Sequence, residues 1–258
     1  MRVVFITRTD ASKMNDLRDQ TDLEDLIKEV GLSGIKDIFI LSKIKESKVK
    51  LFGVSVNTIY DKNPTGATSI NTLLNKIKIK FEAFIACSKE VGLRERNIKY
   101  LIKEIEQTDN LLVAGYKFVI KDRKLNNELR DFYENDNLIA YKVPWNTCAI
   151  WNYDLFIKHV GKFDEITAIN PFKPIGVSID GACSLTPHVG MEDGLAIAQA
   201  VDSDKKIKFI LLDDFLFWDV DSNSKIRHRE KLARKDTVLR NFMGVRNYSV
   251  EDLKVAGM

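Results

Sequence analysis

The hydrophobic positions of this chain form short continuous runs, separated by stretches in which apolar residues recur at helical spacing. The first run covers 3–6 and is followed by polar residues, and similar runs lie at 37–41, 51–56, 111–120 and 206–214. Continuous apolar runs of this length predict strands that are buried on both faces. Helical spacing predicts helices at 23–30, about 94–107, 125–133 and from 193 onward. Strands that alternate with helices predict an α/β fold: a mixed, mainly parallel sheet flanked by helices.

The stretch from 70 to 87 fits two structures. Its apolar residues form a helical stripe as far as Ile85, but those at 81, 83, 85 and 87 also alternate as one face of a strand. Periodicity alone does not separate the two. We predict a helix to about Ile79 and then a strand over 81–87, because a further helix begins near Arg94.

The composition indicates a globular protein with one domain of catalytic size. The chain has 258 residues, of which 45% are hydrophobic and 30% charged. Its apolar start at 3–6 is too short for a signal peptide, and no run approaches the roughly 18 apolar residues of a membrane span, so a cytoplasmic location is expected. Cys87, Cys148 and Cys183 are scattered and lack metal-type spacing. They are expected to be reduced, buried thiols rather than disulfides or zinc ligands.

The segment 225–246 carries most of the positive charge near the C-terminus. Eight basic residues lie there against only Glu230 and Asp236. Such a patch suits a pyrophosphate or an anionic membrane surface, or it is simply the solvated face of a helix. No nucleic-acid partner is expected, because neither a helix-turn-helix nor an exposed aromatic platform accompanies the charge. We therefore divide the chain into a main domain at 1–220 and a basic helix with a tail at 221–258.

The stretch 141–200 concentrates candidate chemistry. It contains two tryptophans, a Gly-Lys-Phe-Asp-Glu turn at 161–165, and the acidic pair Glu192-Asp193 at the predicted start of a helix. Trp145 and Trp151 are candidates for stacking on a sugar or for the core, and their spacing predicts that one of the two points inward. Acidic residues are also favoured in a first helical turn by the helix dipole alone.

The order of elements and several motifs resemble the GT-A superfamily of nucleotide-diphospho-sugar glycosyltransferases, particularly its large inverting family. The resemblance covers roughly residues 1–220. Residues 6–10 correspond to the family's first donor loop, and Ser69-Ile70-Asn71 looks like the family's Asn before a helix. The turn at 161–165 is similar to the family's Gly-x-Phe-Asp-Glu turn, and Glu192-Asp193 resembles its catalytic pair.

The resemblance implies transfer of a sugar from a nucleoside-diphosphate donor to a hydroxyl group of a saccharide, lipid-linked or protein acceptor. Asp193 would be the general base, with Glu192 binding acceptor hydroxyls or exchanging roles with it. Two further groups of residues are implied by position in the chain. The donor-binding candidates are Thr7, Arg8, Asp10, Asn71, Ser88 and Glu90, and the acceptor-binding candidates are Trp145, Asn146, Trp151, Asp164 and His188.

The chain departs from the family at the metal-binding motif. Where the family has Asp-x-Asp, this sequence has Ser88-Lys89-Glu90. Glu90, with His228 from the basic segment, is a candidate ligand for Mg²⁺ or Mn²⁺, since hard cations prefer oxygen ligands. Lys89 is the alternative, because it could neutralise phosphate charge directly. Metal-dependent and metal-independent chemistry therefore both stay open.

Other functions also remain compatible with the sequence. A protein with this fold could bind a nucleotide without transferring a sugar, which the altered Asp-x-Asp position favours. A nucleotidylyltransferase is less consistent, because no Gly-rich phosphate loop lies near residue 10. The last alternative is an interaction domain whose basic helix contacts a partner.

Overall fold

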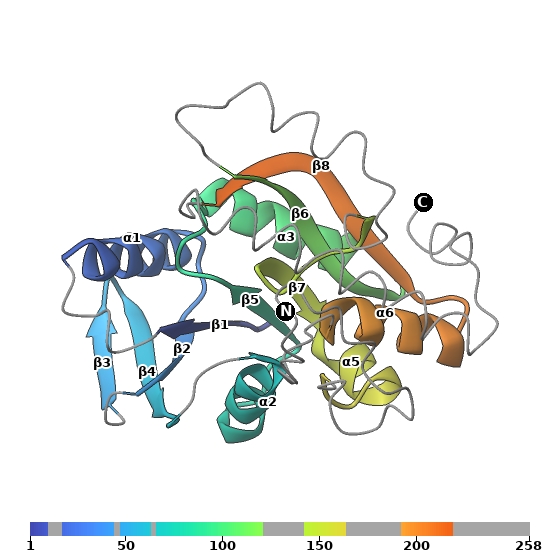
Figure 1. Ribbon diagram of the computed structural model, residues 1–258, viewed down its shortest axis with the longest axis horizontal. Helices are drawn as coiled ribbons and strands as arrows, with labels where there is room; N and C mark the ends of the chain where they lie inside the picture. The colour runs from blue at the N-terminus through green and yellow to red at the C-terminus, as the bar shows by residue number, and fades with distance from the viewer. Residues whose placement is uncertain (10–16, 44–46, 63–65, 121–141, 164–191, 219–258) are drawn as a thin grey trace, which may run out of the picture.

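The computed structural model describes residues 1–9, 17–43, 47–62, 66–120, 142–163 and 192–218 (Figure 1). The strands are β1 (Val3–Thr9), β2 (Asp37–Ser42), β3 (Ser47–Leu51), β4 (Val54–Tyr60), β5 (Ala83–Cys87), β6 (Leu111–Ile120), β7 (Cys148–Asn152) and β8 (Lys208–Trp218). The helices are α1 (Leu17–Leu32), α2 (Gly66–Lys76), α3 (Glu95–Gln107), α5 (Tyr153–His159) and α6 (Glu192–Ser203). The proposed basic helix and tail at 221–258 lie outside the described residues.

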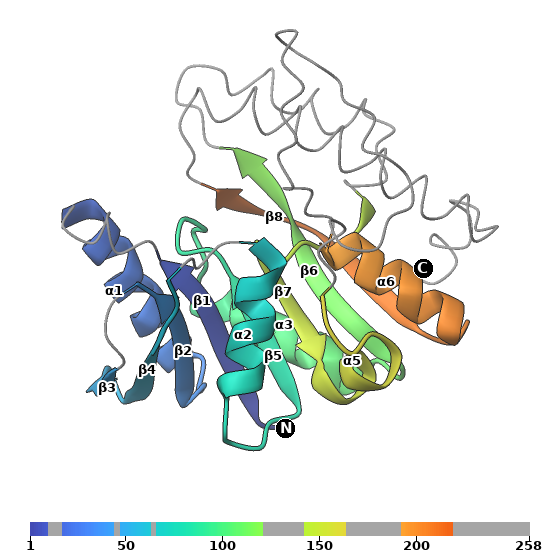
Figure 2. The same ribbon diagram turned by 60° about the horizontal axis from the view of Figure 1, so that its bottom comes forward.

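The described strands form one eight-stranded sheet in the order β3-β4-β2-β1-β5-β7-β6-β8. Strands β4, β2, β1 and β5 run parallel, as do β6 and β8, whereas β3 and β7 run antiparallel to their neighbours. Helices α1 and α3 lie on one side of the sheet, and α2, α5 and α6 on the other (Figures 1 and 2). The prediction of a mixed, mainly parallel α/β sheet is confirmed.

The order of the strands reverses direction next to β1. The chain first builds outward from β1 through β2 to β4, and it then crosses back to place β5 on the opposite side of β1. In open α/β sheets, ligands bind beyond the carboxyl ends of the strands at such a switch point. The residues at and after the carboxyl ends of β1 and β5 are therefore candidates for a ligand-binding site.

Two expectations about individual elements have clear outcomes. The helix-then-strand interpretation of 70–87 is confirmed, since α2 ends at Lys76 and β5 begins at Ala83. The single strand predicted over 51–56 is wrong, because a turn at Phe52 and Gly53 separates the antiparallel strands β3 and β4. Both turn residues have positive φ, 48° and 79°, and this left-handed backbone is typical of two-residue hairpin turns. The helix predicted over 125–133 lies outside the described residues.

An aromatic cluster packs against the α5 side of the sheet. The ring centroid of Phe163 lies 5.0 Å from that of Trp151 and 4.7 Å from that of Phe156, and Phe84 stacks on Trp151 at 6.3 Å. Trp151, Phe84, Phe156 and Phe163 are all 1% exposed or less. Burial of aromatic rings on this scale contributes strongly to stability, so the cluster holds the start of the segment after α5 against the sheet.

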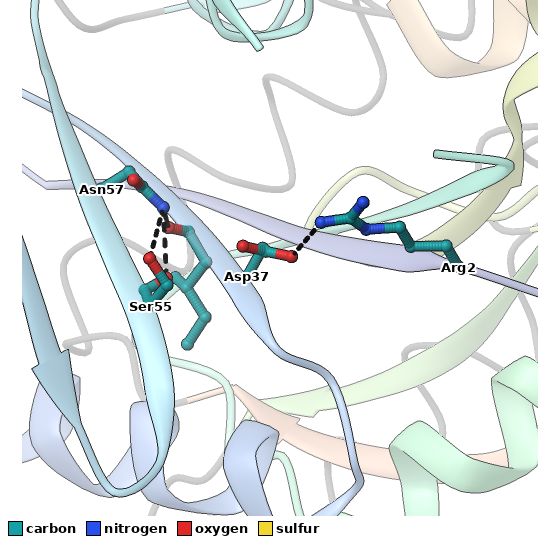
Figure 3. Close-up of polar contacts among 5 residues, drawn as sticks. Arg2, Asp37, Ser55 and Asn57 are labelled. Carbon is teal, nitrogen blue, oxygen red and sulfur yellow. Dashed lines mark hydrogen bonds and ion pairs between the residues drawn. The ribbon is translucent and has the colours of Figure 1, made fainter. Parts of the chain in front are cut away.

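The amino ends of the strands are closed by polar contacts. Arg2 Nη2 lies 2.9 Å from Asp37 Oδ2, and the side-chain amide of Asn57 donates to the carbonyl oxygens of Ile38 and Ser55, each at 3.2 Å (Figure 3). These contacts join β1, β2 and β4 near their amino ends, and the switch point lies at the opposite, carboxyl ends of the strands. Side chains near the amino ends therefore serve as controls for the functional experiments below.

Candidate functional site

The end of β1 carries a buried polar side chain beside β5. Ile6 pairs with Ala86, so the next residue, Thr7, lies alongside the end of β5. Thr7 is 4% exposed, and its hydroxyl oxygen has no hydrogen-bond partner among the described residues. Buried hydroxyls are nearly always satisfied in folded proteins, so an orphaned one at a switch point indicates a place for a ligand or a water molecule. Arg8 follows with an exposed side chain.

The loop after β5 is fixed at both of its ends. The Ser88 backbone N–H donates to the Thr147 carbonyl at 2.8 Å, and the Gly92 N–H donates to the Phe217 carbonyl at 2.8 Å. The loop therefore contacts both the segment before β7 and the end of β8. Within it, Lys89 is only 6% exposed, and Glu90 is partly exposed. A lysine is rarely buried to this degree, and this one lies at the edge where β5 ends.

Asp193 lies in the first turn of α6 and is 4% exposed. Its Oδ1 accepts a hydrogen bond from the Gly194 N–H at 2.9 Å, and its Oδ2 accepts one from the Asn146 N–H at 3.0 Å. Asn146 comes just before β7, whose first residue, Cys148, pairs with Cys87 at the carboxyl end of β5. The Asp193 carboxylate therefore lies at the same edge of the sheet as Thr7, and it is not turned toward bulk water.

The two tryptophans belong to the core. Trp151 is fully buried and Trp145 is 8% exposed, with its ring stacked on Phe118 at a centroid distance of 5.8 Å. The expectation that only one of them points inward is wrong, because β7 lies between β5 and β6 and the segment before it packs on β6. The Trp151 ring, which has no exposed surface, cannot stack on an acceptor sugar. Trp151 instead donates through Nε1 to Asn146 Oδ1 at 2.8 Å.

Asn71 on α2 is engaged by the backbone of Phe163. Its Nδ2 donates to the Phe163 carbonyl at 2.7 Å, and its Oδ1 accepts from the Phe163 N–H at 2.9 Å. Each end of the amide makes one bond to the Phe163 backbone and keeps the capacity for one more. Asn71 therefore holds the backbone of Phe163, the last described residue after α5, next to α2. The sequence contained no signal for this pairing of residues 92 positions apart.

Several predicted site residues are not placed by the structure. Glu192 is the first residue of α6, and the orientation of its side chain is not described. Four others, Asp10, Asp164, His188 and His228, lie outside the described residues. Of the remaining donor candidates, Ser88 is partly exposed at the start of the loop after β5.

The described residues do not assemble a metal site by themselves. No group of three or more His, Cys, Asp and Glu side chains suited to a cation occurs among them. The loop 88–90 contributes a single carboxylate, Glu90. Cys87 and Cys148 are free and buried, as the sequence predicts, and burial together with the neighbouring Cys148 raises the pKa of the Cys87 thiol well above its usual value. Cys87 is therefore protonated at neutral pH and is a poor metal ligand or nucleophile.

Comparison with known proteins places the fold. No protein-family model matches the chain, and no curated protein matches it in sequence. Among solved structures, it is similar to a mannosyltransferase from Pyrobaculum calidifontis in complex with GDP-Man and Mn²⁺, with a TM-score of 0.62 and 11% identity over 98% of this chain and 68% of that one. It is also similar to residues 1–349 of S. aureus TarS, with a TM-score of 0.50 and 11% identity over 85% of this chain and 60% of that one.

The fold is thus GT-A-like, the arrangement expected from the motifs. At this level of identity, the likeness extends to the architecture and not to individual residues. The chain spans roughly two thirds of the length of these two proteins. No helix among the described residues has the length and apolar character needed to cross a membrane.

Proposed function

We propose that this protein is a glycosyltransferase that moves a sugar from a nucleoside-diphosphate donor to a hydroxyl acceptor. The observation that supports this most directly is the position of Asp193. Its buried carboxylate lies beyond the carboxyl ends of β1 and β5, where the strand order reverses and where ligands of α/β sheets bind. The GT-A-like fold, shared with a mannosyltransferase that was solved with GDP-Man, adds the class of donor.

In the proposed reaction, an acceptor hydroxyl oxygen attacks the anomeric carbon of the donor sugar, and the bond from that carbon to the diphosphate oxygen breaks. Asp193 takes the hydroxyl proton as the new glycosidic bond forms, and the nucleoside diphosphate leaves with the bonding electron pair. General base catalysis of this kind typically contributes about 10² to 10⁴ in rate. The hydrogen bonds from Asn146 and Gly194 fix the orientation of the carboxylate, so little reorganisation is needed during the reaction.

The donor is proposed to bind at the switch point between β1 and β5. The Thr7 hydroxyl supplies an unused hydrogen-bonding group, and Arg8 and Lys89 supply positive charge for the diphosphate. Positive groups placed where charge develops on the leaving diphosphate lower the barrier most. Ser88 and Glu90 complete the predicted donor set in the loop after β5.

In this proposal, a divalent cation would serve only to bind the oxygens of the donor diphosphate. The mannosyltransferase of similar fold was solved with Mn²⁺. In this chain, Glu90 is the carboxylate in the loop after β5, and the described residues do not complete a ligand set around it. We therefore route no step of the reaction through a metal. His228, the other predicted ligand, lies outside the described residues.

The second candidate function is nucleotide binding without sugar transfer. It is favoured by one observation, namely that the loop with a single carboxylate also holds the buried Lys89, whereas the resembled family has an Asp-x-Asp motif. The donor site would then form as proposed, and Asp193 would have only a structural role at the start of α6.

One experiment separates the two functions. Purified protein is screened for thermal stabilisation by GDP- and UDP-sugars with and without Mn²⁺, and the donors that bind are tested for hydrolysis and for transfer to saccharide acceptors. We expect Asp193→Asn to lower turnover by about 10² or more while donor affinity is kept. Asp202→Asn, on an exposed residue of the same helix, should behave like the wild type. Binding of a donor without any turnover in the wild type would favour the second candidate.

A further inference from the structure

Asn146 holds a buried amide nitrogen that has no partner among the described residues. We propose that this Nδ2 group binds a sugar hydroxyl oxygen next to the Asp193 carboxylate. The inference rests on the proposed function and assigns a specific contact within that site. It makes Asn146 the residue that presents a hydroxyl group to the base.

The orientation of the amide is determined by its neighbour. The indole Nε1 of Trp151 lies 2.8 Å from one end of the Asn146 side chain. Tryptophan can only donate a hydrogen bond, so the amide atom that faces it must be the oxygen. The nitrogen, with its two N–H groups, therefore occupies the other position. A flipped amide would place two donors face to face and is excluded on the same grounds.

The unpartnered nitrogen belongs to the same residue that binds the proposed base. The Asn146 backbone N–H donates to Asp193 Oδ2 at 3.0 Å. Asn146 thus contacts the carboxylate through its backbone and Trp151 through its side chain. Trp151 is itself fully buried in the aromatic cluster, so close packing limits the movement of the indole that binds the amide.

The chemistry of the pair selects the ligand. A hydroxyl group can accept a hydrogen bond from Nδ2 and donate one to the carboxylate at the same time. A phosphate oxygen at neutral pH only accepts, and it would be repelled by Asp193. A buried donor without a partner carries a free-energy cost that a fitting ligand removes, so a ligand that lacks the hydroxyl should be rejected. The hydroxyl could belong to the acceptor or to the donor sugar, and the experiment must separate these sources.

The test uses Asn146→Asp and Asn146→Ser in the full-length protein. The aspartate variant keeps an oxygen toward Trp151 but replaces the N–H donors with a negatively charged oxygen, whereas the serine variant loses the donors without adding charge next to Asp193. We measure kcat and KM for the acceptor, the pH profile of kcat/KM, and donor affinity by titration calorimetry. The matched controls are Asn57→Asp and Asn57→Ser at the opposite edge, where the amide donates to Ile38 and Ser55.

If the acceptor supplies the hydroxyl, both Asn146 variants should lose about tenfold or more in kcat/KM for the acceptor and keep donor affinity. If the donor sugar supplies it, donor affinity should fall by a similar factor, and affinity for the free nucleoside diphosphate should not. The Asn57 variants should keep wild-type kinetics. These results would support the inference and identify the source.

Two other outcomes overturn it in distinguishable ways. A wild type that transfers sugar, with Asn146 variants that match it in kcat/KM and donor affinity, removes the inference and leaves the proposed function standing. A wild type that transfers nothing removes the proposed function. The inference then depends on donor affinity alone, and equal donor affinity of the wild type and Asn146→Ser would overturn it as well.

Discussion

Gly115 on β6 provides the most sensitive structural test of the site, because a side chain there would push directly on the segment that carries Asn146. A Cβ atom at this position would lie 2.9 Å from Pro144 Cβ, 3.1 Å from the Cys148 carbonyl oxygen and 3.2 Å from Ala149 Cβ. Carbon atoms in good contact are about 3.5–4.0 Å apart. Gly115→Ala therefore requires the segment before β7 to move by roughly 0.5 Å or more.

The expected cost follows from this overlap. Overpacking by one methyl group typically destabilises a core by about 1–3 kcal/mol, and the lower entropy of the unfolded alanine chain offsets about 0.4–1 kcal/mol of it. We expect a net loss of about 1–2 kcal/mol, which lowers Tm by a few degrees in a protein of this size. The displaced segment also carries the N–H that orients Asp193, so turnover should fall by about 10-fold to 100-fold.

The matched control is Gly31→Ala on α1. A Cβ at this glycine would lie 2.8 Å from Val54 Cγ2 and 3.0 Å from the Phe52 carbonyl oxygen, so it is equally crowded but contacts the β3–β4 hairpin. Gly31→Ala should lower Tm and leave turnover, measured well below Tm, at the wild-type value. Full turnover by Gly115→Ala, or an equal loss in both variants, would show that the packing of β6 does not position the site.

Three further predictions concern other contacts of the described residues. Glu29 accepts a hydrogen bond from the Glu95 N–H at 2.8 Å, and this bond is the main cause that lowers the pKa of Glu29 below 4.5. Glu29→Gln should therefore lower the free energy of unfolding by about 1 kcal/mol at pH 7, and by progressively less as pH falls through the folded-state pKa. Urea unfolding at several pH values measures this difference, and a difference that stays constant with pH would contradict the prediction. Asn71→Ala removes two hydrogen bonds to the Phe163 backbone, so it should lower stability by about 1–3 kcal/mol and raise the KM for the acceptor. An unchanged acceptor KM in kinetic assays would argue against a role of Asn71 in holding the turn. Lys89→Met should weaken nucleoside-diphosphate binding about tenfold in chelator-treated protein, and unchanged affinity by calorimetry would remove Lys89 from the donor site.

Local pattern was sufficient for most of the framework. The apolar runs located β1, β2, β6 and β8, and the helical stripe after residue 94 located α3, because burial of one face or of both faces leaves a direct trace in the sequence. The hairpin formed by β3 and β4 escaped the same reasoning. Its turn at Phe52-Gly53 lies inside an apolar run, so hydrophobicity masked the change of direction.

The candidate site was likewise predictable from the sequence only in part. The acidic pair at the start of α6 and the polar residues at the end of β1 were visible as motifs, and the structure brings Asp193 and Thr7 to one edge of the sheet. The burial of both Trp145 and Trp151 was not visible, since an aromatic residue reads alike in a core and in a binding site. The two bonds from Asn71 to the Phe163 backbone were likewise not visible in the sequence.

The amino-acid sequence by itself determined the class of fold, the positions of most strands and helices, and the presence of acid at 193, because each depends on neighbours within a few residues along the chain. Only the tertiary structure decided the strand order, the switch point beside β1, and the contacts of Asn146 and Asn71. These contacts join residues 47 and 92 positions apart, and partners at such distances are chosen by the crossover of the chain and by packing of the aromatic cluster, which no local pattern encodes.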